Sequence, residues 1–396
     1  MKKFLIIFIV GISFLLFGYF LKAKNQDEIV FWTLQMGDYS DYINSVIREY
    51  EVKTNLKIKW VDVPFSEGEK RTLSAILSKN PPDLINLNPD FSILLAQKGA
   101  LKYIPKGKLS DFTSDVVNSL IFDGQIYAIP WYATSAVTFY NKKYTNVFPT
   151  YFDDLPKLAQ KIQDKKVFIY MPNITENDTM AKILNKYGVY SYEKINSDNA
   201  IAVFKMFKDM YDKGQIPKES VTQTQREALE KYMSGQVVYF QGGANFLNLV
   251  KENAPDIYNN TGISEQIKGS LGQNDFSLMN LVIPLKSKHP YEALDFALFL
   301  TNEKNQLELA KLTNIIATNK NVLTSDFYNR DGNLMQKAIS ISSKQLQNVN
   351  PVMHQSRNQK EINLLINTAV QEILINNADI KSTLDRVSEK WKDLQE

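Results

Sequence analysis

The feature that most constrains the fold of this chain is a repeated alternation of short β-type segments with longer helical segments. Predicted strands in the first hundred residues are IVFWTL (29–34), LKIKWVDV (56–63) and DLINLN (83–88). Helical patterns cover residues 38–54, 66–80 and 91–104, with stops at Pro81-Pro82 and near Gly99. The alternation continues towards the C-terminus and predicts an α/β fold whose first lobe is rich in parallel strands.

The length of the chain indicates more than one compact unit. With 396 residues, it is longer than a single hydrophobic core comfortably supports, which favours two lobes. Its hydrophobic content of 44% and charged content of 22% are ordinary for a globular protein, so the composition gives no sign of disorder.

The stretch from Phe122 to Tyr144 carries the most specific local pattern. Asp123-Gly124 between apolar residues predicts a two-residue β-hairpin turn. Pro130 cannot donate a ladder hydrogen bond and is predicted to mark a strand end or edge. Trp131 and Tyr132 are then predicted to lie where the strand gives way to a loop, a common place for binding side chains.

The charge distribution and the scarcity of cysteine and histidine exclude several classes of function. Four lysines without an acid lie in the first 24 residues; without them the count is 42 basic against 43 acidic residues, a net charge of −1. No basic stripe indicates nucleic-acid binding. The absence of cysteine excludes disulfides and thiolate ligands, and two distant histidines exclude a multi-histidine metal site. We therefore expect no metal and no cofactor.

The N-terminus predicts a membrane-directed segment. Residues 4–21 contain no charge, and as a helix they would extend about 27 Å, close to the thickness of a bilayer core. Residues 1–24 are interpreted either as a signal peptide or as an uncleaved anchor, since only Ala23 offers a small residue for cleavage. In both cases we expect the body of the protein to be extracytoplasmic, in the periplasm or on the outer face of the cell membrane.

Several segments in the same order resemble a known family. They are IVFWT, LSAILSKNPPDLINLNPD, LLAQKGALKYI, the stretch 122–144, YMSGQVVYFQGGANF, PYEALDFALFLTNEKNQ and the last two helices. From Glu28 to Trp391 the chain is similar to the family 1 extracellular solute-binding proteins of ABC importers, which include maltose- and oligosaccharide-binding proteins.

The resemblance implies a type II-like periplasmic-binding-protein fold. Two α/β lobes are joined by crossover hinge segments, and a ligand is caught in the cleft between them. Residues 25–137 and 281–327 are expected to form the N-lobe, and residues 138–280 and 328–396 the C-lobe. The two lobes close on a ligand only if that ligand binds the closed state more tightly than the open state.

A sugar site needs flat side chains for the ring faces and amides or carboxylates for the hydroxyl groups. Candidates lie where strands end and at a glycine-rich turn of the C-lobe. They are Trp32, Thr33, Gln35, Asn88, Asp90, Trp131, Tyr132, Asn173, Gly242, Gly243, Asn245, Phe246 and Asn274. For Trp32, core packing is an equal alternative, and for Asp90 a helix N-cap is an equal alternative. At the glycine-rich turn many sugar-binding relatives carry an aromatic residue where this chain has Ala244-Asn245-Phe246, so only Phe246 could stack there.

These features predict a non-catalytic receptor that captures a carbohydrate and delivers it to membrane permeases of an ABC transporter, most simply as a monomer. Three alternatives stay open. The solute could be a polyamine, an iron chelate or an organophosphate; the protein could be an anchored sensor partner; or it could be a glycoside hydrolase, although no motif singles out a pair of catalytic carboxylates.

Overall fold

The computed structural model describes residues 28–164, 166–313, 315–330, 332–349 and 358–395. The chain divides into two compact units. Of the described residues, the first unit contains 28–87, 100–102 and 281–300, and the second contains 88–99, 103–280 and those from Thr301 onward. The predicted N-terminal signal or anchor segment lies outside the described residues. Within those residues, none of the helices has the length and apolar character needed to cross a membrane.

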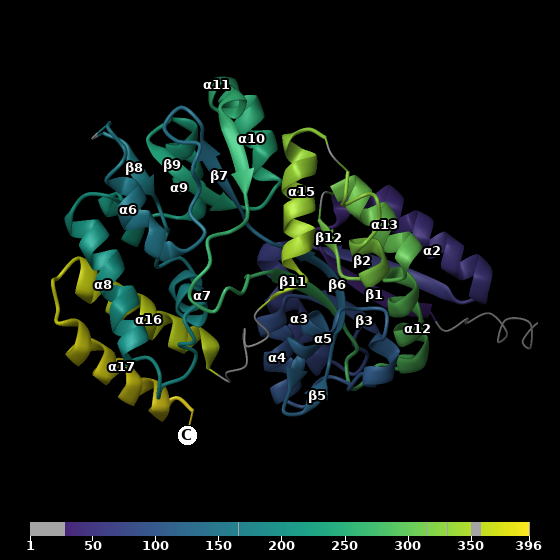
Figure 1. Ribbon diagram of the computed structural model, residues 1–396. Helices are drawn as coiled ribbons and strands as arrows, with labels where there is room; N and C mark the ends of the chain where they lie inside the picture. The colour runs from purple at the N-terminus through teal and green to yellow at the C-terminus, as the bar shows by residue number, and fades with distance from the viewer. Residues whose placement is uncertain (1–27, 165, 314, 331, 350–357, 396) are drawn as a thin grey trace, which may run out of the picture. The chain divides into compact units, whose positions relative to one another are not determined.

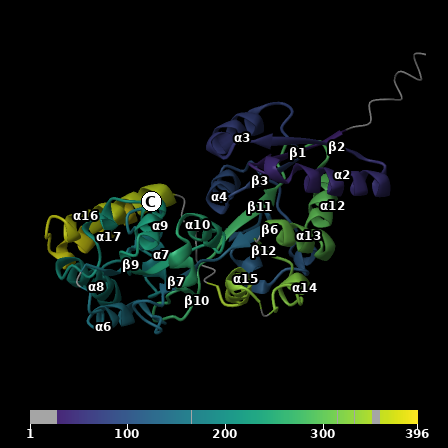
Figure 2. The same cartoon turned by 90° about the horizontal axis from the view of Figure 1, so that it is seen from above.

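The first unit is built on parallel strands, as the alternation predicts. In its sheet β1 lies between β2 and β3. The neighbour of β3 on its other side is β11, the strand in which the chain returns to this unit. The helices α2 and α12 pack together beside these strands (Figure 2), where the Phe296 ring lies 5.0 Å from Tyr50 and 5.4 Å from Phe31, centroid to centroid. The element bounds are β1 Glu28–Leu34, α2 Ser40–Thr54, β2 Lys57–Val63, α3 Gly68–Leu77, β3 Leu84–Leu87, β11 Ser277–Val282 and α12 Pro290–Leu300.

The second unit contains a mixed four-stranded sheet in the order β10-β7-β9-β8. β8 and β9 are parallel, whereas β7 is antiparallel to both of its neighbours. The strands are β7 Val137–Asn141, β8 Phe168–Tyr170, β9 Val237–Gly242 and β10 Thr261–Ser264. The helices in this part of the chain are α6 Leu155–Ala159, α7 Thr179–Asn185, α8 Asp198–Asp212, α9 Gln225–Met233, α10 Phe246–Asn253 and α11 Pro255–Asn259.

The last two helices complete the core of this sheet. α16 and α17 lie side by side and pack against α8 (Figure 1). Their apolar side chains join those of β8, β9 and α8 in one buried cluster. The remaining elements of the second unit are α4 Pro89–Gln97, α5 Ser114–Asn118, β4 Ile121–Phe122, β5 Gln125–Ile126, β6 Ile129–Thr134, α13 Glu303–Thr313, β12 Ile316–Ala317, α14 Lys320–Leu323, α15 Leu334–Gln345, α16 Gln359–Leu374 and α17 Ile380–Asp393.

The predicted hairpin at Asp123-Gly124 is confirmed. β4 and β5 pair in antiparallel fashion around this turn, and both turn residues have positive φ, at 48° and 73°. Such a turn matches the right-handed twist of the paired strands.

The interpretation of Pro130 as a strand end or edge was wrong. Pro130 is the second residue of β6, which continues through Trp131 and Tyr132 to Thr134 and lies between β12 and β11. A proline is tolerated near the start of a strand because only one donor is lost there, and its carbonyl still accepts a hydrogen bond from the Thr318 hydroxyl at 3.0 Å. Trp131 and Tyr132 therefore lie in a strand and not in a loop.

Two residues of α16 provide a matched test of the core of the second unit. Ile366 is 2% exposed within the apolar cluster, whereas Leu364 on the same helix is 67% exposed. We expect Ile366→Ala to lower the free energy of unfolding by about 2–5 kcal/mol, because it removes buried methyl groups and leaves a cavity. Leu364→Ala should change it by less than about 0.5 kcal/mol. Urea denaturation of both full-length variants measures the difference, and equal losses would contradict this core.

Candidate functional site

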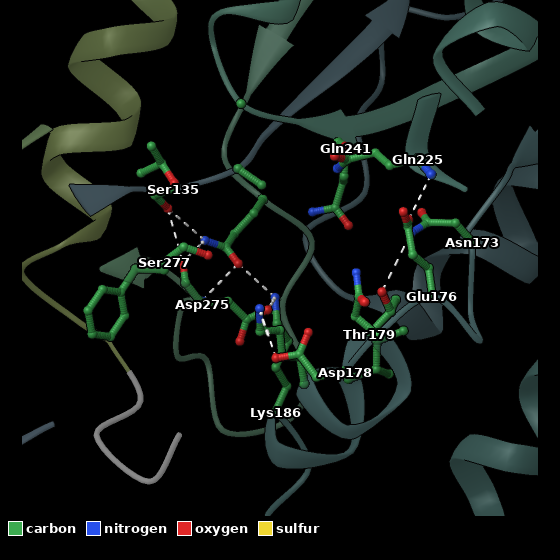
Figure 3. Close-up of a pocket in the computed structure, with 18 of the residues that line it drawn as sticks. Ser135, Asn173, Glu176, Asp178, Thr179, Lys186, Gln225, Gln241, Asp275 and Ser277 are labelled. Atoms are coloured by element: carbon green, nitrogen blue, oxygen red, sulfur yellow. Dashed lines mark hydrogen bonds and ion pairs between the residues drawn. The ribbon is translucent and has the colours of Figure 1, made fainter. Parts of the chain in front are cut away.

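A cavity of about 320 Å³ lies in the second unit, at the carboxyl ends of β8 and β9. Because these two strands are parallel, their carboxyl ends meet at one edge of the sheet, where open α/β sheets place their ligands. Tyr170 is the last residue of β8, and Gly243 directly follows β9. Gln241, near the end of β9, lines the same cavity (Figure 3). The wall is mainly polar and is completed by side chains from α7, from the start of α9 and from residues 134–136 and 275–277.

One face of α7 supplies a row of polar side chains to the cavity. Thr179, Lys182 and Lys186 are separated by three and four residues, so they lie on the same side of the helix and its cap. Asp178 precedes the helix and forms an ion pair with Lys182, with 3.1 Å between Nζ and Oδ2. Burial by itself would lower the pKa of Lys182, but the carboxylates of Asp178 and Asp275 outweigh it and raise that pKa. Lys182 therefore remains an ammonium group paired with Asp178.

Lys186 is held deeper in the wall, and its side chain is only 3% exposed. Its Nζ lies 3.0 Å from Asp275 Oδ2 and donates hydrogen bonds of 2.8 Å to Gln266 Oε1 and to the Ile267 carbonyl. Burial lowers the pKa of Lys186, and the Asp275 carboxylate offsets part of this effect. An ammonium group has three N–H donors, so these three acceptors satisfy all of its donors.

Glu176 occupies the opposite side of the cavity. Its Oε2 accepts hydrogen bonds of 2.7 Å from Asn173 Nδ2 and from the main-chain N–H of Gln225, the first residue of α9 (Figure 3). Asn173 has a φ of 32°, a left-handed conformation that asparagine tolerates better than most residues. The carboxylate is therefore fixed by an amide and by a helix N-terminus, where negative charge is stabilised.

Buried amides connect the segment between β6 and β7, the segment between β10 and β11, and the last residue of α15. Ser135, between β6 and β7, accepts hydrogen bonds at Oγ from Gln266 Nε2 (3.1 Å) and Gln345 Nε2 (3.0 Å), and it donates to the Asp275 carbonyl (3.1 Å). Gln266 Oε1 also accepts from the Asp275 main-chain N–H at 2.9 Å. This network fixes the strand ends from which the cavity wall projects.

Two of the predicted ligand-binding residues, Asn173 and Gly243, line this cavity. Gly242 is buried at the end of β9, Asn245 is exposed, and Phe246 begins α10 with its ring 5.8 Å from that of Phe240. The buried side-chain amide of Asn274 donates to the carbonyls of Gln345 and Asn348 and lies outside the cavity wall.

The predicted stacking pair does not line the cavity. Trp131 is completely buried in β6, and its carbonyl accepts a hydrogen bond of 2.8 Å from Gln306 Nε2. Tyr132 is half-buried, and the two rings are in edge contact at 5.2 Å between centroids. In this conformation the Trp131 ring packs into the protein interior.

The other five predicted residues lie in the second half of β1, directly after β1, or shortly after β3. Asn88 caps α4, since its Oδ1 accepts from the Phe91 main-chain N–H at 2.9 Å, and Asp90 follows in the first turn of that helix. In the first unit Thr33 is buried and donates to Asp62 Oδ1 at 2.6 Å. Trp32 is half-buried in β1, and Gln35 is exposed with a φ of 52°. A ligand-binding role for these five residues stays a prediction.

The sequence reasoning missed most of the charged wall. The residues it missed include Glu176, Asp178, Lys182, Lys186, Gln225 and Gln241. A signal was present, because Thr179, Lys182 and Lys186 form a polar row at helical spacing, a short way after the apolar segment VFIYM (167–171). Among the described residues, no cluster of acidic residues and histidines could hold a metal ion.

Comparison with known proteins decides the family. Residues 45–336 match the model of the bacterial extracellular solute-binding proteins. The chain belongs to this family. The predicted resemblance to extracellular solute-binding proteins is thereby confirmed.

Several named proteins are distant from this chain in sequence but similar to it over most of their length. The diacetylchitobiose-binding protein DasA of Streptomyces coelicolor is 22% identical, over 76% of this chain and 75% of its own. The galactooligosaccharide-binding protein of Bacillus subtilis is 21% identical, over 93% of this chain and 90% of its own. The maltose-binding protein MalE of Listeria monocytogenes, solved with maltose, is 18% identical and matches 93% of this chain and 98% of its own with a TM-score of 0.79. The predicted two-lobed α/β periplasmic-binding-protein fold is confirmed by this similarity.

Proposed function

We propose that this solute-binding protein is the carbohydrate receptor of an ABC importer and delivers its sugar to permease subunits in the membrane. The observation that carries the proposal is the cavity wall, in which Asn173, Glu176, Gln225 and Gln241 combine amide and carboxylate groups beside the Tyr170 ring. Amides both donate to and accept from sugar hydroxyl groups, carboxylates accept from them, and an aromatic ring matches the apolar face of a sugar. The named relatives bind diacetylchitobiose, galactooligosaccharide and maltose, which supports the same ligand class here.

The proposal includes the predicted lobes and location. Residues 25–137 with 281–327 and residues 138–280 with 328–396 act as the N-lobe and the C-lobe, and a sugar that favours the closed state shifts the population towards it. The apolar segment 4–21 directs the protein to an extracytoplasmic location, as a signal peptide or as an anchor. The named relatives are binding proteins, and accordingly we propose a monomeric receptor without a catalytic step.

A thermal-shift screen tests the ligand class. The full-length protein, kept in a detergent without a sugar headgroup, is heated with mono- and oligosaccharides, polyamines and phosphate esters. A ligand at one hundred times its dissociation constant stabilises the native state by about 2.7 kcal/mol, so at least one carbohydrate should raise the melting temperature by several degrees. A shift with a polyamine or a phosphate ester, and with no carbohydrate, would contradict the carbohydrate proposal.

A further inference from the structure

The charges around the cavity are not balanced. Two lysines, Lys182 and Lys186, face three carboxylates, Glu176, Asp178 and Asp275, so the wall carries a formal net charge of −1. Two of the carboxylates have a lysine partner each: Asp178 pairs with Lys182 at 3.1 Å, and Asp275 pairs with Lys186 at 3.0 Å. The excess negative charge therefore belongs to Glu176.

Neutral groups alone stabilise the Glu176 carboxylate. Its Oε2 accepts from the Asn173 amide and from the Gln225 main-chain N–H, both at 2.7 Å, and both donors are uncharged. Within the described part of the chain, the second oxygen, Oε1, makes no hydrogen bond. The carboxylate is thus held in one orientation with an acceptor left over, and a ligand that brings a donor gains a charge-assisted hydrogen bond without having to order this side chain.

The lysines of the wall are poorly suited to bind an anion. Lys186 has three acceptors for its three N–H groups, in Asp275, Gln266 and the Ile267 carbonyl, and only 3% of its side chain is exposed. Lys182 is 25% exposed, and an anion that approached it would also approach its partner Asp178. A phosphate or a carboxylate would have to displace one of these internal partners.

We infer that this cavity selects a neutral or cationic carbohydrate, with a hydroxyl or ammonium group donating to Glu176, and discriminates against uronates and sugar phosphates. The inference rests on the proposed carbohydrate function and narrows its substrate class. The uncompensated charge acts over a few ångströms in a partly buried site, where one unit charge changes the affinity of a charged ligand by about tenfold or more. Glu176 is accordingly the specificity-determining residue of the cavity.

Isothermal titration calorimetry on the full-length protein tests this inference. The probes are matched in ring and linkage and differ in charge: cellobiose, chitobiose and cellobiouronate, and galactose, galactosamine and galacturonate. Spermidine and glycerol phosphate serve as cationic and anionic probes without a sugar. At pH 6 and low salt the amines are protonated and screening is weak. We expect cellobiouronate to bind at least about tenfold more weakly than cellobiose, or galacturonate at least about tenfold more weakly than galactose, in whichever of the two sets binds.

Two variants assign the effect to Glu176. Glu176→Gln keeps the shape and the accepting oxygen for Asn173 and Gln225 but replaces Oε1 by a donor, so the neutral or cationic probe that binds should lose about tenfold or more in affinity. Glu227→Gln is the matched control, because Glu227 lies in the first turn of the same helix α9, outside the cavity wall, and glutamine retains its capping contact with Thr224. This control should bind within about twofold of the unchanged protein.

The outcomes separate the inference from the proposed function. Tighter or equal binding of a uronate or of glycerol phosphate overturns the inference, as does unchanged affinity of Glu176→Gln. Failure of every neutral and cationic probe also overturns it. Binding of spermidine with no sugar, lost in Glu176→Gln, would uphold the charge selection by Glu176 while the carbohydrate function fails.

Discussion

Asp275→Asn is expected to lower the free energy of unfolding by about 3 kcal/mol. The change removes the negative partner of Lys186, whose side chain is 3% exposed and whose Nζ lies 3.0 Å from the Asp275 carboxylate. A buried cation without its counter-charge pays the desolvation cost without the compensating attraction. Urea denaturation of the full-length protein, followed by tryptophan fluorescence, measures the loss.

A double variant separates the lost ion pair from a general disturbance of the site. Lys186→Met together with Asp275→Asn removes both charges, and replacing a buried pair with apolar or neutral groups often costs little. We expect the double variant to be more stable than Asp275→Asn alone. A double variant as unstable as the sum of the two single changes would show that the two side chains act independently.

Gly269→Ala is expected to have a similarly large effect, about 2–3 kcal/mol of lost stability. A Cβ atom at this position would lie 2.6 Å from the main-chain oxygen of Lys186 and 2.8 Å from its carbonyl carbon. Backbone atoms cannot move aside as a flexible side chain can, so α7 and the Lys186 side chain would shift together. The variant should therefore also bind its ligand more weakly in the same titration.

Gly107→Ala provides the control for this substitution. A Cβ atom at Gly107 meets no atom within 4 Å, so the change should alter the stability by less than about 0.5 kcal/mol. The same urea denaturation compares the two variants. Equal stability of Gly269→Ala and Gly107→Ala would contradict the close approach of Gly269 to α7.

Local patterns predicted the secondary structure well where short-range interactions decide it. The strands β1, β2 and β3, the helices between them and the turn at Asp123-Gly124 all lie close to their predicted places. The same reasoning failed at Pro130, because a proline stops a strand or begins one depending on which neighbours take up the remaining hydrogen bonds. The partner of Pro130 is Thr318, 188 residues away along the chain.

The candidate site was predictable only in part. Asn173 and Gly243 follow strands and were recognised as candidates on that ground, and both line the cavity. Trp131 is predicted as an aromatic residue in a loop that follows a strand, but the structure buries it within β6. Glu176 was missed because its importance depends on the amide of Asn173 and the N-terminus of α9, and the second of these lies about fifty residues further along the chain.

The sequence by itself determined the α/β class and the order of segments that marks a solute-binding protein, because periodicity and turn chemistry are local properties. Only the tertiary structure decided which charges reach the cavity and which are neutralised. The sequence does not distinguish Lys182 from Lys186 as a possible ligand for an anion. In the structure, Lys182 pairs with Asp178, and Lys186 is enclosed by Asp275, Gln266 and a main-chain carbonyl. Electrostatic partnership depends on distance in space, so the excess charge on Glu176 appears only once the chain is folded.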